Sequence, residues 1–408
     1  MLRITGALSP SGSPQEIILK TPMDADLNAE GLFAFPGLID PHVHFRTPGM
    51  EHKEDWQTAA AAAIRGGYTT VFDMPNTIPP TITAETLNEK KALIDKQLRA
   101  ARIPLHYALF FGADKNHLQE IYRVHNEIIG IKVFMGCSTG NLVIDDDESL
   151  EKVFAIAAEL NLIVAVHAED EALIRQRKLE YQYSKQYCDH SHIRNIEVAT
   201  RALEKAIALT RKYGTRLYVL HASSANEMTL IRAAKAAGLP VYAETTPHHL
   251  FLDDRAYADL QGKAVVNPPL RNQQQHDALW QAIQDGTIDT IGSDHAPHLE
   301  NEKAASYGSC PSGMPGIETT LPLLLTAHHQ GLISLERILQ LTCLRPREIF
   351  GLMPNEDWVL VDLAQTKIVH NRALKTKCQW SAFAGRALTG WPKYTILQGQ
   401  IFDFSSEF

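Results

Sequence analysis

Short apolar runs alternate with longer amphipathic stretches through the middle of the chain. The runs are rich in β-branched and aromatic residues, whereas the stretches repeat apolar positions every three to four residues, as helices do. The expected strands are Thr69–Asp73, His106–Phe111, Gly130–Phe134, Ile163–His167, Arg216–His221, Val241–Glu244 and Thr290–Asp294. The expected helices are Trp56–Arg65, Ala84–Ala100, Asp147–Glu159, His192–Lys212, Ser224–Ala237, Gln275–Asp285 and Gly316–His328.

This alternation predicts an α/β fold with a parallel sheet. With the run that ends at Asp40, there are eight strands, each followed by a helix or a long loop. Eight such units are the number in a (β/α)8 TIM-like barrel. The alternative is an open doubly wound sheet, but no G-x-G-x-x-G follows the first strand, which disfavours its dinucleotide-binding form.

The two ends of the chain share a different pattern. Residues 1–34, and those from about 355 onward, alternate apolar and polar positions in short pieces broken by Pro and Gly, which is typical of small β-strands. We therefore predict two domains. Residues 1–36 plus 353–408 form a small β-sandwich domain built from both chain ends, and residues 37–352 form the barrel.

Composition narrows the class of protein. The 408 residues are 45% apolar and 21% charged, with a net charge of −8, which argues against non-specific nucleic-acid binding. No apolar run approaches the roughly 18 residues needed to cross a bilayer. The first residues lack the apolar core of a signal peptide, and five dispersed cysteines without CxxC spacing fit a reducing compartment. We expect a cytoplasmic protein that binds neither nucleic acid nor membrane.

The segment Phe35–Arg46 carries the first sign of chemistry. His42 and His44 are two residues apart at the end of an apolar run, so in a strand both imidazoles project from one face. Two adjacent imidazoles suit a transition metal. The pair alone is equally compatible with polar residues where a strand leaves the core.

Further polar residues stand at the ends of other predicted strands. Taken singly, each has an ordinary explanation, such as a loop-edge histidine, a snorkelling lysine or a helix cap. In a barrel, however, the carboxyl ends of all strands converge on one mouth, where barrel active sites lie. The residues in question are Lys132, His167, His221 and Asp294, together with the His42/His44 pair.

Lys132 is unexpected in such a set, because an ammonium group has no lone pair for a metal. Carboxylation by CO2 would turn it into an anionic carbamate with two oxygens, enough to bridge two cations. A two-metal centre lowers the pKa of a shared water and yields a hydroxide near neutrality. Asp294 can then ligate a metal and act as the catalytic proton carrier.

These residues resemble the metal set of the amidohydrolase superfamily, and nearly the whole chain resembles its dihydroorotases. The motifs that carry the resemblance are His44-Phe-Arg46-x-Pro-Gly, Met74-Pro-Asn76-Thr, Val266-Asn267-Pro-Pro-Leu-Arg, Ser293-Asp294-His-Ala-Pro-His298 and Gly313-Met-Pro-Gly-Ile-Glu. The resemblance implies two zinc ions, bridged by carboxylated Lys132 and a hydroxide. It also implies the interconversion of N-carbamoyl-L-aspartate and L-dihydroorotate in pyrimidine (UMP) biosynthesis.

The same resemblance implies contacts to a substrate that bears a carboxylate. Arg46 shares the face of the histidine pair, and its guanidinium can grip a carboxylate with two hydrogen bonds. Asn76 offers a donor and an acceptor. Asn267, His298 and the backbone of Ser312 and Gly313 match further substrate contacts of the family. A surface salt bridge is the alternative for Arg46.

Several questions stay open at this level. Allantoinases and hydantoinases/dihydropyrimidinases share the metal set, and a metal-free, non-catalytic homologue is a third possibility. Glu244 is expected to support a ligand rather than to hold an additional metal. The small polar segment Gly136–Asn141 is either a loop over the mouth or a plain turn. We also expect a homo-oligomer, a dimer, that acts on a small molecule.

Overall fold

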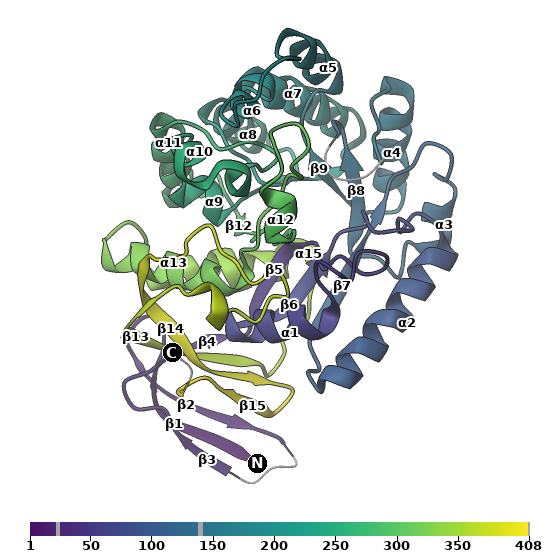
Figure 1. Ribbon diagram of the computed structural model, residues 1–408. Helices are drawn as coiled ribbons and strands as arrows, with labels where there is room; N and C mark the ends of the chain where they lie inside the picture. Colours follow the sequence, from purple (N-terminus) through teal and green to yellow (C-terminus); the bar gives the residue numbers. More distant parts are fainter. Residues whose placement is uncertain (22–24, 138–141, 407–408) are drawn as a thin grey trace.

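The computed structural model describes residues 1–21, 25–137 and 142–406. Its larger sheet has eight parallel strands that follow one another in sequence order, from β5 to β12 (Figure 1). These strands are β5 (Leu38–Val43), β6 (Tyr68–Asp73), β7 (His106–Gly112), β8 (Gly130–Phe134), β9 (Ile163–His167), β10 (Arg216–Val219), β11 (Val241–Thr245) and β12 (Thr290–Ile291).

The first and last strands of this sheet also meet. Val43 and His295 form a parallel bridge, and the His44 N–H donates to the carbonyl of His295 at 2.8 Å. The sheet is therefore closed into a barrel, and the predicted (β/α)8 fold is confirmed.

Helices cover the outside of the barrel (Figure 1). The helices of the described chain are α1 (Trp56–Arg65), α2 (Ala84–Ala101), α3 (Glu120–Val124), α4 (Asp147–Glu159), α5 (Glu171–Glu180), α6 (Asp189–Ile193), α7 (Ile196–Tyr213), α8 (Ala225–Ala236), α9 (Pro247–Phe251), α10 (Ala256–Leu260), η1 (Gln261–Ala264), α11 (Gln273–Gln284), α12 (Glu300–Lys303), α13 (Ile317–His329), α14 (Leu335–Leu339), η2 (Gln340–Leu344), α15 (Arg345–Phe350) and, between β13 and β14, η3 (Asn371–Ala373). Within the described residues, no helix combines the length and apolarity that a membrane span requires.

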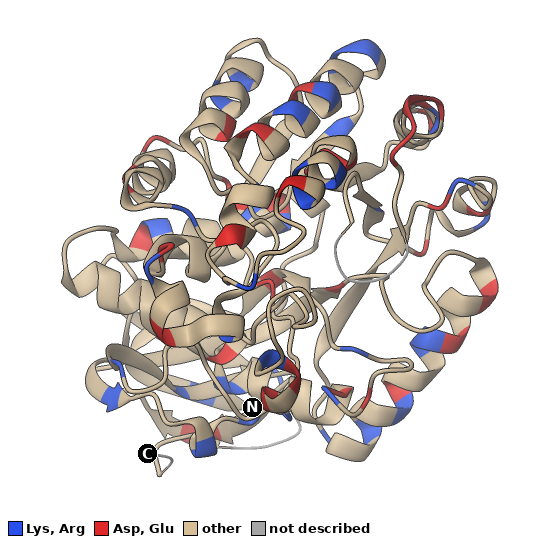
Figure 2. Cartoon of the chain, turned by 45° about the horizontal axis from the view of Figure 1, so that its top comes forward, with Lys and Arg blue, Asp and Glu red and all other residues tan. Residues whose placement is uncertain are grey.

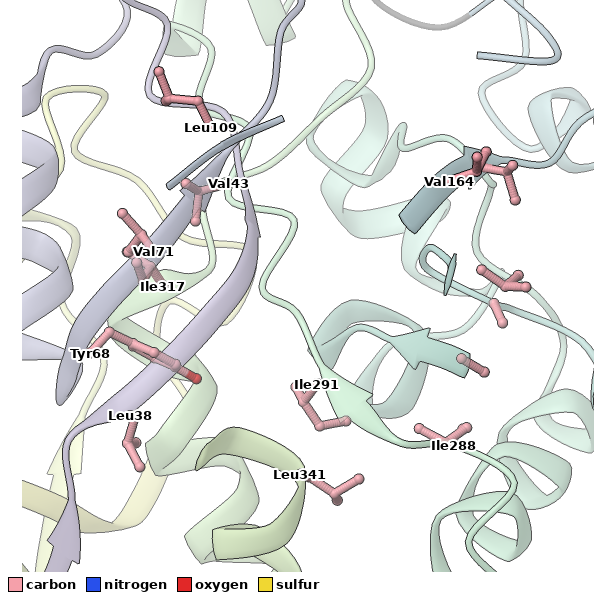
Figure 3. Packing of buried hydrophobic residues seen from close by; sticks show 14 of the residues in the cluster. Leu38, Val43, Tyr68, Val71, Leu109, Val164, Ile288, Ile291, Ile317 and Leu341 are labelled. Carbon is pink, nitrogen blue, oxygen red and sulfur yellow. The ribbon is translucent and has the colours of Figure 1, made fainter. Parts of the chain in front are cut away.

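The barrel strands are buried on both faces because helices pack outside them and side chains fill the inside. Every residue of β5, β6, β8 and β9 is buried. Figure 3 shows how apolar side chains from consecutive strands and the helices around them pack together, including Leu38, Val71, Val164 and Ile317. This packing gives the strand ends a rigid base.

The smaller sheet joins both ends of the chain, as predicted. Its seven strands are β1 (Leu2–Leu8), β2 (Pro14–Leu19), β3 (Ala25–Asn28), β4 (Phe33–Pro36), β13 (Trp358–Ile368), β14 (Ala387–Leu397) and β15 (Gln400–Asp403). Strand β4 pairs with β13 in antiparallel register, from Trp358 opposite Pro36 to Val361 opposite Phe33. The sheet forms the sandwich-like domain, while the boundaries at residues 36/37 and 352/353 stay our proposal.

Most predicted elements differ from the observed ones by only one or two residues at an end, and three differences have a clear structural cause. Strands β10 and β12 end before His221 and Asp294, whose φ angles of 37° and 45° turn the chain out of the ladder. The predicted helix His192–Lys212 is divided into α6 and α7, because Asn195 caps α7 by accepting from the backbone N–H of Val198. The turns after β10 and β12 place both polar side chains at the mouth.

Candidate metal centre and substrate pocket

Three of the predicted ligands form one compact cluster. Nε2 of His42 and Nε2 of His44 lie 3.3 and 3.2 Å from Oδ1 of Asp294. The other ring nitrogens are engaged elsewhere: Nδ1 of His42 lies 2.8 Å from a carboxylate oxygen of Glu244, and Nδ1 of His44 lies 2.8 Å from the amide oxygen of Asn76. Both partners are acceptors, so each Nδ1 carries the proton.

This tautomer leaves lone pairs on both Nε2 atoms. Burial lowers the pKa of His44 to about 3, so its ring is neutral. Two nitrogen lone pairs and a carboxylate oxygen then face one another, with all three ligand atoms within 4.8 Å. Such a set repels itself unless a cation lies between its members, and the cluster therefore fits a divalent metal ion.

The remaining histidines form a second pair beside this cluster. Nδ1 of His167 and Nε2 of His221 are 2.9 Å apart, and the rings of His42 and His221 are 5.4 Å apart between centroids. Nδ1 of His221 is buried and has no hydrogen-bond partner among the described residues. Nε2 of His167 bonds to Glu169 at 2.8 Å. Because Glu169 accepts from Nε2 of His167, Nδ1 of His167 presents its lone pair to Nε2 of His221, and two imidazole nitrogens that face each other in this way fit a second metal ion.

Lys132 lies buried on β8, and its Nζ is 4.6 Å from the centroid of the Phe134 ring. Burial lowers the pKa of Lys132 to about 7, although the charges of Asp294 and Glu244 oppose this shift. A substantial fraction of the amine is thus neutral near pH 7, as reaction with CO2 requires. The residue meets the chemical condition for the predicted carbamate.

Arg46 follows the histidine pair in the sequence, and only 2% of its surface is exposed. Its Nε donates to the carbonyl of Pro297 at 2.9 Å, and its Nη2 is 3.0 Å from Nε2 of His298. Among the residues that the structure describes, no carboxylate forms an ion pair with it. Burial lowers its pKa to about 10, so the side chain stays charged. A buried, unpaired cation is costly, and an anionic ligand would compensate it.

The loop before α13 lies against His298. Nε2 of His298 is 3.0 Å from the carbonyl of Ser312, and the Gly313 N–H donates to Val265 at 3.0 Å. Gly313 has a φ of 129°, and a Cβ there would lie 2.7 Å from the carbonyl oxygen of Ala296. Only glycine suits this close approach. The structure thus brings the predicted Ser312 and Gly313 next to the predicted His298 and Arg46.

Two histidines outside the motifs of the sequence hold the segment of Asn267. Nε2 of His190 lies 2.8 Å from Oδ1 of Asn267, and Nε2 of His249 lies 3.0 Å from the carbonyl of Pro268. Both rings are buried. Neither histidine ends a strand, so polarity at strand ends does not reveal them, yet they fix the position of a predicted substrate contact.

Sequence reasoning also missed Glu169, which bonds to His167 and pairs with Arg194. Its place two residues after His167, on the same face, was an available signal. Glu244 bonds to His42 and to the His221 N–H, which are the contacts that support of a ligand would require. Of the predicted loop Gly136–Asn141, residues 138–141 lie outside the described part.

The chain matches a known family from strand β4 to strand β15. Residues 33–401 match the amidohydrolase family. The chain belongs to this amidohydrolase family. The dihydroorotase of Methanosarcina acetivorans is 33% identical over 396 residues, which are 93% of this chain and 83% of that protein. The dihydroorotase of Halobacterium salinarum is 36% identical over 388 residues, covering 92% and 87%.

Solved structures of amidohydrolases share the fold. The L-hydantoinase (dihydropyrimidinase) of Arthrobacter aurescens superposes with a TM-score of 0.91 at 26% identity, covering 98% of this chain and 95% of that one. Membership of the amidohydrolases is therefore supported by sequence and structure alike, and a metal-free, non-catalytic role is disfavoured because His42, His44 and Asp294 could together hold a metal ion.

Proposed function

We propose that this chain is a dihydroorotase, which interconverts L-dihydroorotate and N-carbamoyl-L-aspartate in pyrimidine biosynthesis. The observation that carries the proposal is the buried Arg46, which has no carboxylate partner among the described residues and lies beside the metal-fitting cluster. A cyclic amide with a carboxylate satisfies both features. The identity to curated dihydroorotases over more than nine-tenths of the chain supports the same choice.

Two zinc ions would be held by six side chains at the strand ends. Lys132, as a carbamate, would bridge them, and the other ligands would be His42, His44, His167, His221 and Asp294. Bound zinc would supply Lewis acidity and lower the pKa of water toward neutrality. The orientations of three ligand rings would be fixed by Glu244, Asn76 and Glu169. Each of these residues lies at hydrogen-bond distance from the ring nitrogen of one histidine that does not face the metals.

The side chains of the pocket would divide the reaction between them. Arg46 would bind the carboxylate of dihydroorotate, with Asn76, Asn267 and His298 close by. Asp294 would take a proton at a carboxylate oxygen from the attacking water. A C–O bond forms at the ring carbonyl, the C–N bond breaks, and Asp294 returns the proton to the departing nitrogen. Cyclisation follows the same steps in reverse.

The backbone of Ser312 and Gly313 is proposed to complete the ring contacts. Gly313 lies in a loop that is fixed at one side by Val265 and at the other by His298. Backbone groups held in this way can hydrogen-bond a pyrimidine ring without rearrangement.

A hydantoinase or dihydropyrimidinase is the second candidate, favoured by the TM-score of 0.91 to an L-hydantoinase. The metal ligands do not discriminate between these activities. A buried guanidinium does, because a neutral ring such as dihydrouracil leaves it without an anion. For this reason dihydroorotase is the better supported activity.

The compartment, the class of substrate and the oligomeric state of the enzyme are also part of the proposal. None of the five cysteines is in a disulfide, as expected for a reducing cytoplasm. Basic and acidic residues are mixed along the helices visible in Figure 2, which fits a small-molecule substrate better than a polyanion. A homo-oligomer, a dimer, remains part of the proposal.

The test is an absorbance assay of dihydroorotate hydrolysis with and without a chelator. We expect turnover that a chelator abolishes and zinc restores. Arg46→Ala should raise the KM for dihydroorotate about a hundredfold, since it removes a charged hydrogen-bond donor, and should leave the KM for dihydrouracil unchanged. Turnover of dihydrouracil alone, or equal effects of Arg46→Ala on both rings, would favour the second candidate.

A further inference from the structure

The ring of His298 is fully buried and touches three polar groups with its two nitrogens. Nδ1 lies 3.0 Å from Nζ of Lys53. Nε2 lies 3.0 Å from the carbonyl oxygen of Ser312 and 3.0 Å from Nη2 of Arg46. An ammonium group only donates and a carbonyl oxygen only accepts, so these contacts restrict where the imidazole proton can reside.

The contact with Lys53 selects one tautomer of the neutral ring. Because Lys53 donates to Nδ1, that atom must carry the lone pair, and Nε2 carries the proton and donates to Ser312. The opposite tautomer would let Nε2 accept from Arg46, but it would place an N–H against the ammonium and a lone pair against the carbonyl, so two of the three contacts would be unfavourable. Burial, together with the charges of Arg46 and Lys53, holds the pKa of His298 well below its usual range, so the ring stays neutral.

Lys53 is itself held in place. Its Nζ lies 2.9 Å from Oε1 of Glu302, and only 12% of its side chain is exposed. The other oxygen of Glu302 accepts the backbone N–H of Leu299 at 2.8 Å. The glutamate thus pairs with the lysine and directs it to Nδ1 of His298.

The tautomer has a consequence for Arg46. Its Nη2 faces an N–H of His298 rather than a lone pair, so this contact satisfies none of its hydrogens. Those hydrogens stay available for an incoming anion. At the same time, the Nε2 proton of His298 anchors the carbonyl of Ser312, and with it the loop to Gly313, whose tight packing leaves no room for a side chain.

We propose that Lys53 is a positioning residue that fixes the Nε2–H tautomer of His298, and so keeps Arg46 ready for the anionic group of the substrate. The identity of that anion rests on the proposed function. The tautomer does not, because it follows from contacts within the protein.

The tautomer can be measured directly in enzyme labelled with 15N-histidine. Long-range 1H–15N NMR spectra distinguish protonated from unprotonated ring nitrogens, and the His298 signals are identified by their loss in His298→Gln. We expect the Nε2–H form in the wild type and in Lys53→Arg, and a mixture of both tautomers in Lys53→Met. The matched control is Lys263→Met. Lys263 pairs with Glu300, which lies on helix α12 as Glu302 does, but Lys263 does not contact His298.

Kinetics give the second readout. Lys53→Met should raise the KM for dihydroorotate about tenfold, with kcat changed less than about twofold, because one charged hydrogen bond is lost from the binding apparatus. Lys53→Arg should recover most of the loss, and Lys263→Met should match the wild type. The resolved signals of the other histidines report whether each variant is folded.

The two readouts separate the possible failures. An unchanged Nε2–H tautomer in a folded Lys53→Met enzyme overturns the proposal, and a raised KM in that variant would make Lys53 a direct ligand. If the enzyme does not turn over dihydroorotate, the proposed function fails, while the tautomer measurement still decides the role of Lys53.

Discussion

At the residue scale, the metal-fitting histidines are oriented by hydrogen-bond partners on the side away from the mouth of the barrel. His42, His44 and His167 each have one ring nitrogen directed at the mouth and the other at a fixed oxygen of Glu244, Asn76 or Glu169. An imidazole held in this way presents its lone pair without rotating, so its affinity for a metal would depend on residues that do not touch the metal themselves.

Glu244→Gln should weaken metal binding about tenfold to a hundredfold, since the amide interacts less strongly with the Nδ1 proton of His42. Metal content after dialysis against a competing chelator measures the effect. The control is Glu227→Gln, because Glu227 is equally buried but bonds to Ser223 and Ser224 instead. Equal metal loss in both variants would assign the effect to general destabilisation.

Much of the candidate site could be predicted from the sequence because its members end strands. Polarity at the end of an apolar run identified His42, His44 and His167 as a set. What could not be predicted was the second contact of each side chain. The partners of His190 and His249 are the loop residues Asn267 and Pro268, far away in sequence, and no local pattern reports such a contact.

At the element scale, periodicity identified the barrel strands and helices, but the ends of some elements depend on tertiary contacts. Strands β10 and β12 stop early because His221 and Asp294 adopt positive φ angles, which apolar runs do not reveal. In contrast, α1 and α4 have the predicted bounds, since each begins after an aspartate whose side chain caps the helix.

The end of α1 packs so closely against the start of α13 that a side chain does not fit between them. A Cβ on Gly66 would lie 2.4 Å from the carbonyl oxygen of Ile317. Gly66→Ala should therefore lower the free energy of unfolding by about 2 to 3 kcal/mol, as overpacking does. Denaturant unfolding measures this change.

Gly214→Ala is the control for that measurement. Gly214 has a φ of 72°, but the described residues place no atom within 4 Å of a Cβ there. Its substitution should cost about 1 kcal/mol from backbone strain alone. A smaller loss for Gly66→Ala than for Gly214→Ala would show that the two helices can separate freely.

At the scale of the whole molecule, buried neutral histidines couple stability to pH. Burial lowers the pKa of His190 to about 4 from an ordinary value of 6.5. The unfolded chain takes up a proton below the higher value, whereas the fold does not until near the lower one. The stability contributed by the neutral ring is thus complete above 6.5 and is lost as the pH falls toward 4.

For the metal-free enzyme, this single histidine should remove about 2 kcal/mol of stability between neutral pH and about pH 5. Urea unfolding at both pH values measures the loss, and in His190→Gln the difference between them should be smaller by that amount. An identical pH dependence in the variant would mean that His190 titrates alike in the folded and unfolded chain.

The pairing of β4 with β13 has a consequence for the time at which the enzyme becomes whole. Strand β4 is followed after one residue by β5, which carries His42, yet its neighbour β13 follows all eight barrel strands in the sequence. During translation, the edge of β4 that pairs with β13 therefore stays without this partner while the barrel strands are synthesised. The segment that leads into His42 therefore gains its pairing with β13 only after the barrel strands have been translated.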